Sequence, residues 1–141
     1  MVDDLPTTRK AWVKRVDKLD RVTDIERAIA NHALWMLRLR EAVFQAHPPV
    51  DVDEVRAEDQ CEFGKWLHGS RLSVEDRASS DYQDVRRLHA DFHRLAAQVV
   101  ELAASGKTRD AYDLLYGEYI TMSGRLAIAM RAWQDTLKGT P

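Results

Sequence analysis

The chain has 141 residues, a formal net charge of -2 and a single cysteine. This length suits one domain with its own core. The nearly balanced charge indicates no basic surface of the kind that binds nucleic acid. The lone cysteine suits a reducing compartment, no stretch approaches the ~20 apolar residues of a membrane span, and the first residues lack the apolar run of a signal peptide. We therefore expect a soluble, cytoplasmic protein with one domain.

Residues 6–22 have the pattern of a short basic amphipathic helix. Six Lys or Arg residues surround an apolar face formed by Trp12, Val13, Val16 and Leu19. Such a helix can bind a membrane surface or a partner. The simpler interpretation, which we favour, is a solvated helix that packs Trp12 against the main body of the protein.

The next helix is predicted to begin at Thr23, because Thr23 and Glu26 have the spacing of a capping box. From there the apolar positions step by three and four residues, through Ile25, Ile29, His32, Met36, Leu39, Val43 and Ala46. His32 therefore occupies a position that faces the core. Pro48 and Pro49 predict the end of this helix.

The middle of the chain lacks a long periodic run, but it contains a short predicted helix. Asp59 and Glu62 repeat the capping pattern, and Gly69 closes the helix after about two turns. Cys61 would then lie in the first turn, where free N–H groups and the helix dipole favour its thiolate. Gly64 weakens a helix, which indicates a close approach to a neighbouring backbone.

Two further long helices are predicted over about 80–104 and 108–138. The inward positions of the first are Tyr82, Val85, His89, Phe92, His93, Ala96, Val99 and Ala103. Those of the second are Tyr112, Leu115, Tyr119, Met122, Leu126, Ala129, Trp133 and Leu137. Gly117 and Gly124 share one face of the second helix, which indicates close packing of another helix there, and Gly139 ends it.

These patterns predict an all-α fold, an antiparallel four-helix bundle with a short extra helix that carries the cysteine. We divide the chain into an N-terminal amphipathic extension, residues 1–22, and a bundle, residues 23–138. No strand pattern competes with this interpretation, and no internal repeat suggests a second domain.

Four residues with side chains that bind zinc fall at core-facing or helix-start positions. His89 and His93 are one helical turn apart, and burying both without partners would cost a few kcal/mol. His32 or Cys61 alone would usually be an ordinary core residue, but the four together indicate a metal site. Three imidazoles and a thiolate suit Zn²⁺, and four protein ligands leave no position for a catalytic water. We therefore expect no enzymatic activity.

The remaining histidines have plainer interpretations. His47 lies at a helix end, and His68 precedes Gly69, where it can bond to unsatisfied carbonyls. Because His68 is close to Cys61 in the sequence, it remains an alternative ligand.

Three segments then resemble the chemoreceptor zinc-binding (CZB) domain family, in the family's order. They are His32-Ala33-Leu34-Trp35, Cys61-Glu62-Phe63-Gly64-Lys65-Trp66-Leu67 and His89-Ala90-Asp91-Phe92-His93. The resemblance extends from about Thr23 to beyond Leu102. It implies a bundle that binds one zinc, usually as a homodimer, with the ligands His32, Cys61, His89 and His93. It also implies a packing shell of Trp35, Phe63, Gly64 and Trp66.

The resemblance implies a sensory role as well. Such domains regulate bacterial chemoreceptors and diguanylate cyclases, and they respond to zinc or to oxidants such as hypochlorous acid through the zinc-bound cysteine. Family members commonly adjoin a methyl-accepting or GGDEF output domain, for which this chain has no room. We therefore expect a stand-alone module for chemotaxis or cyclic di-GMP signalling that acts on a separate partner, with Cys61 as its labile redox switch.

Two enzymatic or redox alternatives remain open. A metal-dependent hydrolase or transferase would use the three histidines with Cys61 unbound, although no His-Glu-x-x-His motif supplies a general base. A di-iron bundle would need Glu-x-x-His motifs, and none of the five histidines has a Glu three residues before it.

Overall fold

The computed structural model describes residues 8–45 and 51–139, and every element in these ranges is a helix. The long helices are α1 (Arg9–Phe44), α5 (Ser80–Ala104) and a continuous rod of α6 (Thr108–Leu114), η2 (Leu115–Tyr119) and α7 (Ile120–Lys138). The short helices are α2 (Val52–Arg56), α3 (Glu62–His68) and α4 (Val74–Ala78). The predicted all-α fold is confirmed.

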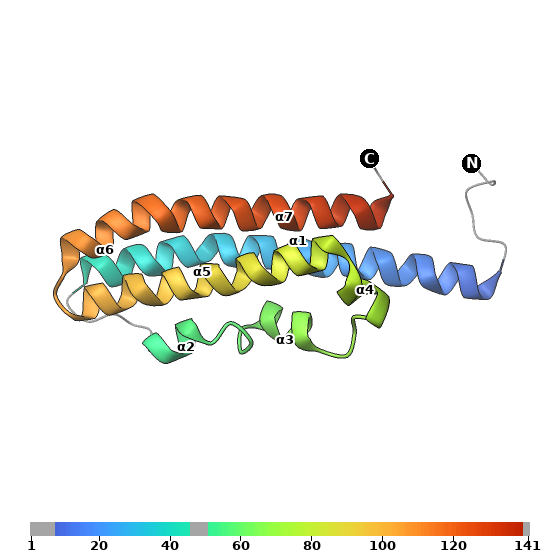
Figure 1. Cartoon of the computed structure of the whole chain (residues 1–141), viewed down its shortest axis with the longest axis horizontal. Coiled ribbons are helices and arrows are strands. Elements are labelled where there is room, and N and C mark those ends of the chain that lie inside the picture. Colours follow the sequence, from blue (N-terminus) through green and yellow to red (C-terminus); the bar gives the residue numbers. More distant parts are fainter. Residues whose placement is uncertain (1–7, 46–50, 140–141) are drawn as a thin grey trace.

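The chain crosses the bundle four times and reverses direction each time (Figure 1). The first pass is α1, the third is α5 and the fourth is the rod that ends with α7. The second pass, which lies along the side of α5, is broken into the three short helices. The bundle is therefore antiparallel, but its fourth member is a segmented stretch of chain rather than the leading helix.

Helix α1 begins much earlier than predicted. Thr8 is its N-cap and accepts a hydrogen bond from the Ala11 backbone N–H at 3.1 Å. Thr23 lies inside the helix, where its hydroxyl donates to the Leu19 carbonyl at 3.1 Å. Glu26 accepts from the Gln134 side chain at 2.9 Å instead of capping a helix. The capping box predicted at Thr23 is therefore wrong, and the boundary between residues 22 and 23 falls inside one helix.

The first turns of α1 project beyond the other helices (Figure 1). Residues 8–20 are all exposed, and Trp12 remains 50% exposed. The predicted packing of Trp12 against the main body is wrong, because no other element extends far enough to cover it. Helix α1 ends at Phe44 with Gln45 as its C-cap. Ala46, His47, Pro48 and Pro49 lie outside the described residues.

The core follows the predicted pattern most closely along α5, where all eight inward positions are buried. On α1, Ile25, Leu39 and Val43 are buried. The last rod buries Leu115, Tyr119, Leu126 and Trp133, whereas Tyr112 is 41% exposed. Helix α5 thus lies at the centre of the apolar interior, and its side chains have the least access to water.

The broken second pass has its own local signals. Asp51 caps α2, and Ser73 and Asp76 form a capping box at α4, while Ser79 caps α5. Neither α2 nor α4 was predicted, because five residues are too few to show a period. Gly69 is the C-cap of α3, as predicted.

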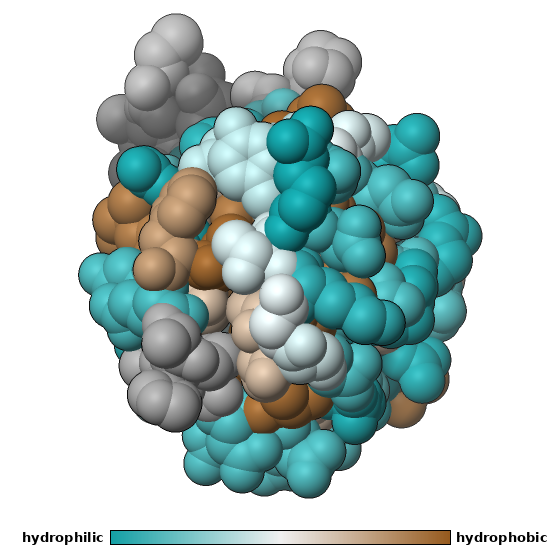
Figure 2. All heavy atoms as spheres, turned by 90° about the vertical axis from the view of Figure 1, so that its left-hand side faces the viewer, coloured by the Kyte–Doolittle hydropathy of each residue, from teal (hydrophilic) through white to brown (hydrophobic). Residues whose placement is uncertain are grey.

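The end of the bundle at the α5–α6 turn presents mostly hydrophilic residues with small scattered apolar ones (Figure 2). Among the described residues, α1 exposes larger apolar side chains along its whole length, at Trp12, Val13, Val16, Leu19, Leu34, Leu37 and Phe44.

The close packing predicted at Gly117 and Gly124 is wrong. A Cβ atom added at either glycine would have no neighbour within 4 Å. Gly117 lies instead in η2, a π-helical turn that inserts an extra residue into the rod. Gly139 ends α7 with φ of 76°, a left-handed conformation that favours glycine.

Gly124→Ala should raise the free energy of unfolding by about 1 kcal/mol, because alanine favours the helix and meets no neighbour. Gly139→Ala should lower it by about 1 kcal/mol, because alanine strains a left-handed residue. Urea unfolding monitored by circular dichroism measures both values. A destabilised Gly124→Ala protein would contradict the open surface described for α7.

Candidate metal centre

Four side chains converge in the interior of the bundle. His32 comes from α1, His89 and His93 come from successive turns of α5, and Cys61 comes from the start of α3. One possible ligand atom from each lies within 4.8 Å of those of the other three. The histidines are 7%, 0% and 1% exposed in chain order, and Cys61 is half-buried. The structure thus brings together all four of the predicted ligands.

The three imidazoles are held by their outer nitrogens. Nδ1 of His32 contacts the Ala28 carbonyl at 2.8 Å, and Nδ1 of His93 contacts the Val55 carbonyl at 2.7 Å. A carbonyl only accepts, so both rings carry their proton on Nδ1 and leave a lone pair on Nε2. Nδ1 of His89 lies 3.3 Å from a carboxylate oxygen of Glu58. In all three rings the outer nitrogen thus contacts a carbonyl or carboxylate oxygen, as is usual for metal-bound histidines.

The inner nitrogens lack the partners that a buried polar atom needs. Nε2 of His32 and Nε2 of His93 are buried and find no hydrogen-bond partner among the described residues. Nε2 of His89 lies 3.4 Å from Cys61 Sγ. An unsatisfied buried acceptor costs about 1–3 kcal/mol. A metal ion bound by the three imidazole nitrogens and the sulfur would remove this cost. Three nitrogen ligands and one thiolate match the ligand types and the coordination number that Zn²⁺ prefers.

Cys61 is the N-cap of α3 rather than a residue of its first turn. Its Sγ accepts from the Gly64 backbone N–H at 3.2 Å, and its thiol donates to the Glu58 carbonyl at 3.7 Å. The sulfur thus takes the place that a Ser or Asp oxygen usually takes at a helix start. The cap fixes the direction of the sulfur toward His89.

Burial controls the protonation of the cluster. Desolvation lowers the pKa of His32 to about 4 and that of His89 to about 2, and it also lowers the pKa of His93. The imidazoles are therefore neutral at pH 7 and ready to bind a metal. Desolvation also raises the pKa of the Cys61 thiol, although the N–H groups of Gly64 and Phe63 oppose it. The predicted preference for the thiolate is wrong for the metal-free site, and a bound dication would reverse it.

Glu58 is a site residue that the sequence patterns did not reveal. One carboxylate oxygen contacts His89 Nδ1, and both oxygens lie near His68 Nε2, at 3.1 and 3.3 Å. His68 thus bonds to Glu58 and neither joins the cluster nor caps a helix carbonyl. Glu58 also reaches the ring nitrogen of His89 that points away from Cys61, so it is not placed as a general base for a metal-bound water.

The predicted packing shell surrounds the cluster. Phe63 meets the rings of His32 and His89 edge-on, with centroids 5.6 and 5.2 Å apart, and Trp66 stacks on Phe63 at 5.5 Å. Trp35 lies against His93 at 6.2 Å. These aromatic rings cover part of the cluster on the α1 and α3 sides.

Gly64 makes the close backbone approach that was predicted. A Cβ atom built on it would lie 1.7 Å from the Glu58 carbonyl oxygen, which is a severe clash with backbone atoms. The loop that carries Glu58 therefore packs directly on the first turn of α3. This packing brings Cys61 and Glu58 to the same side of His89.

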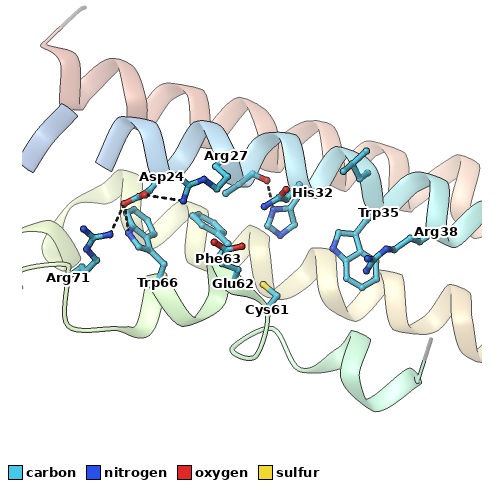
Figure 3. Close-up of a pocket in the computed structure, with 13 residues that line it drawn as sticks. Asp24, Arg27, His32, Trp35, Arg38, Cys61, Glu62, Phe63, Trp66 and Arg71 are labelled. Atoms are coloured by element: carbon cyan, nitrogen blue, oxygen red, sulfur yellow. Dashed lines mark hydrogen bonds and ion pairs between the residues drawn. The ribbon is translucent and has the colours of Figure 1, made fainter. Parts of the chain in front are cut away.

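A cavity of about 470 Å³ leads to the cluster between α1 and α3 (Figure 3). His32 and Cys61 line it, with walls that include Trp35, Phe63 and Trp66. His89 and His93 lie behind them and do not line the cavity. Small molecules can therefore approach the sulfur from this side before they reach the two α5 histidines.

Comparison with known families agrees with this geometry. Residues 32–100 match the family model of the chemoreceptor zinc-binding domain, from the first candidate ligand to beyond the last. The matched part of the chain contains all four candidate ligands. No curated protein and no solved structure matched the chain. Among the described residues, no helix is long and apolar enough to cross a membrane.

Gly64→Ala should displace the loop at Glu58 and weaken zinc binding at the cluster on the order of tenfold or more, because the methyl group clashes with backbone. Zinc affinity measured by competition with a chromogenic chelator tests this. Gly124→Ala, which adds the same methyl group in open space, is the matched control and should bind zinc as the natural chain does. Equal affinities of the two variants would contradict the proposed packing.

Proposed function

We propose that this CZB domain binds one Zn²⁺ through His32, Cys61, His89 and His93 and serves as a sensory module. The observation that supports this most is the pair of buried, unpartnered Nε2 atoms aimed at the same point as Cys61 Sγ. Four protein donors complete a tetrahedral zinc shell, which suits a regulatory or structural role better than catalysis. A reduced thiol ligand favours a reducing compartment such as the cytoplasm.

The proposed signal is zinc itself or an oxidant that removes the thiolate ligand. Bound zinc keeps the Cys61 sulfur deprotonated and therefore nucleophilic. Hypochlorous acid transfers oxygen to such a sulfur and releases chloride, which leaves a sulfenic acid. A sulfenic acid is a poor zinc ligand, so the cluster would lose its one bond to α3.

The response would begin in the segment 59–69, since Cys61 lies at the N-cap of a helix of only seven residues. The three histidines lie on helices of 36 and 25 residues that carry the core. Short, partly exposed elements open locally more easily than long core helices. Release of Cys61 would free this segment, and a partner, such as a chemoreceptor or a diguanylate cyclase pathway, would detect the change.

Zinc binding measured by calorimetry in buffers of different ionisation enthalpy tests the site. The natural chain should bind one zinc per chain and release about one proton at pH 7, because the thiol is protonated and the imidazoles are neutral. For the same reason, affinity should rise about tenfold per pH unit until the pH exceeds the raised pKa of the thiol. Cys61→Ala should stay helical, bind zinc on the order of 100-fold more weakly and release no proton.

Hypochlorous acid should release zinc from the natural chain and change the binding of Cys61→Ala little. Equal zinc affinity and equal oxidant response in the two proteins would exclude Cys61 as the switch. Two bound irons would indicate the di-iron alternative, and hydrolytic turnover with zinc bound to the histidines alone would indicate the enzymatic one.

We also propose that the domain forms a homodimer through the outer face of α1. The exposed side chains Trp12, Leu19, Leu34, Leu37 and Phe44 recur at helical spacing, and each is between 50% and 63% exposed. At ~100° per residue they lie opposite the buried Ile25, His32 and Leu39. Helix α1 therefore has a second apolar face that the rest of the chain leaves uncovered.

Leu37→Asp should convert the dimer to a monomer, because a carboxylate at the centre of an apolar helix pair is costly to bury. Light scattering coupled to size-exclusion chromatography measures the mass. Ile128→Asp on α7, where the isoleucine is 71% exposed, is the control and should remain dimeric. A monomeric natural chain, or a dimer that Leu37→Asp does not change, would refute this interface.

A further inference from the structure

Asp24 of α1 receives several donors from the segment that carries Cys61. Its Oδ2 accepts a hydrogen bond from Trp66 Nε1 at 3.1 Å and lies 3.5 Å from Arg71 Nη1. Its Oδ1 lies 3.9 Å from Arg27 of the same helix. The Asp24 side chain is only 18% exposed. A half-buried carboxylate with this set of donors forms a stronger contact than a surface ion pair.

Trp66 connects this carboxylate to the metal cluster. Its ring stacks on Phe63 with an interplanar angle of 19°, and it also contacts Trp133 of α7 at 5.5 Å. Phe63 in turn packs edge-on against His32 and His89. A continuous row of packed rings therefore runs from Asp24 to two of the candidate ligands (Figure 3).

The contacts of α3 are divided between the two neighbouring long helices. Toward α5, the Tyr82 hydroxyl donates to the Leu67 carbonyl at 3.0 Å. Toward α1, the hydrogen bond is the one from Trp66 to Asp24. The cavity of about 470 Å³ lies between α1 and α3, and Phe63 of α3 also meets His32 of α1 edge-on. Loss of the Asp24 contact would remove this hydrogen bond between α1 and α3 and leave ring packing to hold α3 on this side.

We propose that Asp24 is a positioning residue that holds α3, and with it Cys61, against α1. It does not touch the cluster, and it acts through Trp66 and Phe63. The strength of this contact would set how often Cys61 leaves the metal, and therefore the rate at which the site releases zinc or exposes its sulfur. This inference rests on the proposed zinc site. It adds that the contact between Asp24 and Trp66 controls how readily this site opens.

The test is the rate of Cys61 alkylation by iodoacetamide and of zinc release to a chelator, in the zinc-loaded protein under native conditions. A hydrogen bond to a charged group is strong enough to change an opening equilibrium by about tenfold to a hundredfold. Asp24→Ala should therefore accelerate both rates about tenfold or more. Asp24→Asn, which keeps an acceptor for Trp66 but loses the charge, should fall between Asp24→Ala and the natural chain.

Trp66→Phe, which removes the donor together with one ring of the indole, should accelerate both rates. In the double variant with Asp24→Ala, the acceleration should be smaller than the product of the two single accelerations. Hydrogen exchange should increase in residues 61–68 and stay unchanged at the centre of α5. Asp113→Ala, which removes the surface pair with Arg109 at 3.3 Å, is the control and should change neither rate.

An unchanged alkylation rate in Asp24→Ala would refute the inference. An equal increase of hydrogen exchange in α5 would also refute it, because Asp24 would then stabilise the whole bundle and not the position of α3 in particular. If the natural chain binds no zinc, the proposed function fails separately, and alkylation and hydrogen exchange of the metal-free protein still decide the role of Asp24.

Discussion

Polar atoms that are buried without partners determine how this bundle is organised. Three imidazoles lie where water does not reach, and each has its outer nitrogen bonded to a carbonyl or a carboxylate. The bonds orient the rings so that the inner nitrogens point at one another and at a sulfur. In an interior of low dielectric, a cation shared by these donors would remove the cost of burying them without partners. The protein thus holds a set of donors able to bind a metal.

The same constraint explains why the second pass of the chain is broken. A continuous helix there would present its side chains to α5 and keep its carbonyls within the helix. The loop and short helices instead bring the Val55 carbonyl to His93, the Glu58 carboxylate to His89, and Cys61 to the N-cap of α3. Gly64 permits this arrangement, because any larger residue would collide with the Glu58 carbonyl. The irregular backbone thus supplies contacts to the histidines that a regular helix in this position would not make.

The long helices and the ligands were predictable because both follow from helical periodicity. The inward series of α5 placed His89 and His93 correctly, since eight buried positions over 25 residues leave little freedom in orientation. Glu58 and the helices α2 and α4 were not predictable, because their roles depend on contacts between residues distant in the sequence. Thr23 shows the opposite failure. Thr23 and Glu26 have the spacing of a capping box, but they lie inside a longer helix, where the Thr23 hydroxyl bonds to the Leu19 carbonyl instead.

Helix α1 connects the metal centre to the exposed surface. Its inner face carries His32 and Asp24, which hold the cluster and α3, and its outer face carries Leu34 and Leu37. Because a helix of 36 residues moves as a rigid rod over short distances, a change in how α3 packs on its inner face also changes the position of the outer face. A shift of α1 relative to α5 would alter a helix pair formed on that outer face. The helix that would hold the proposed zinc through His32 is thus also the element best placed to pass on its loss.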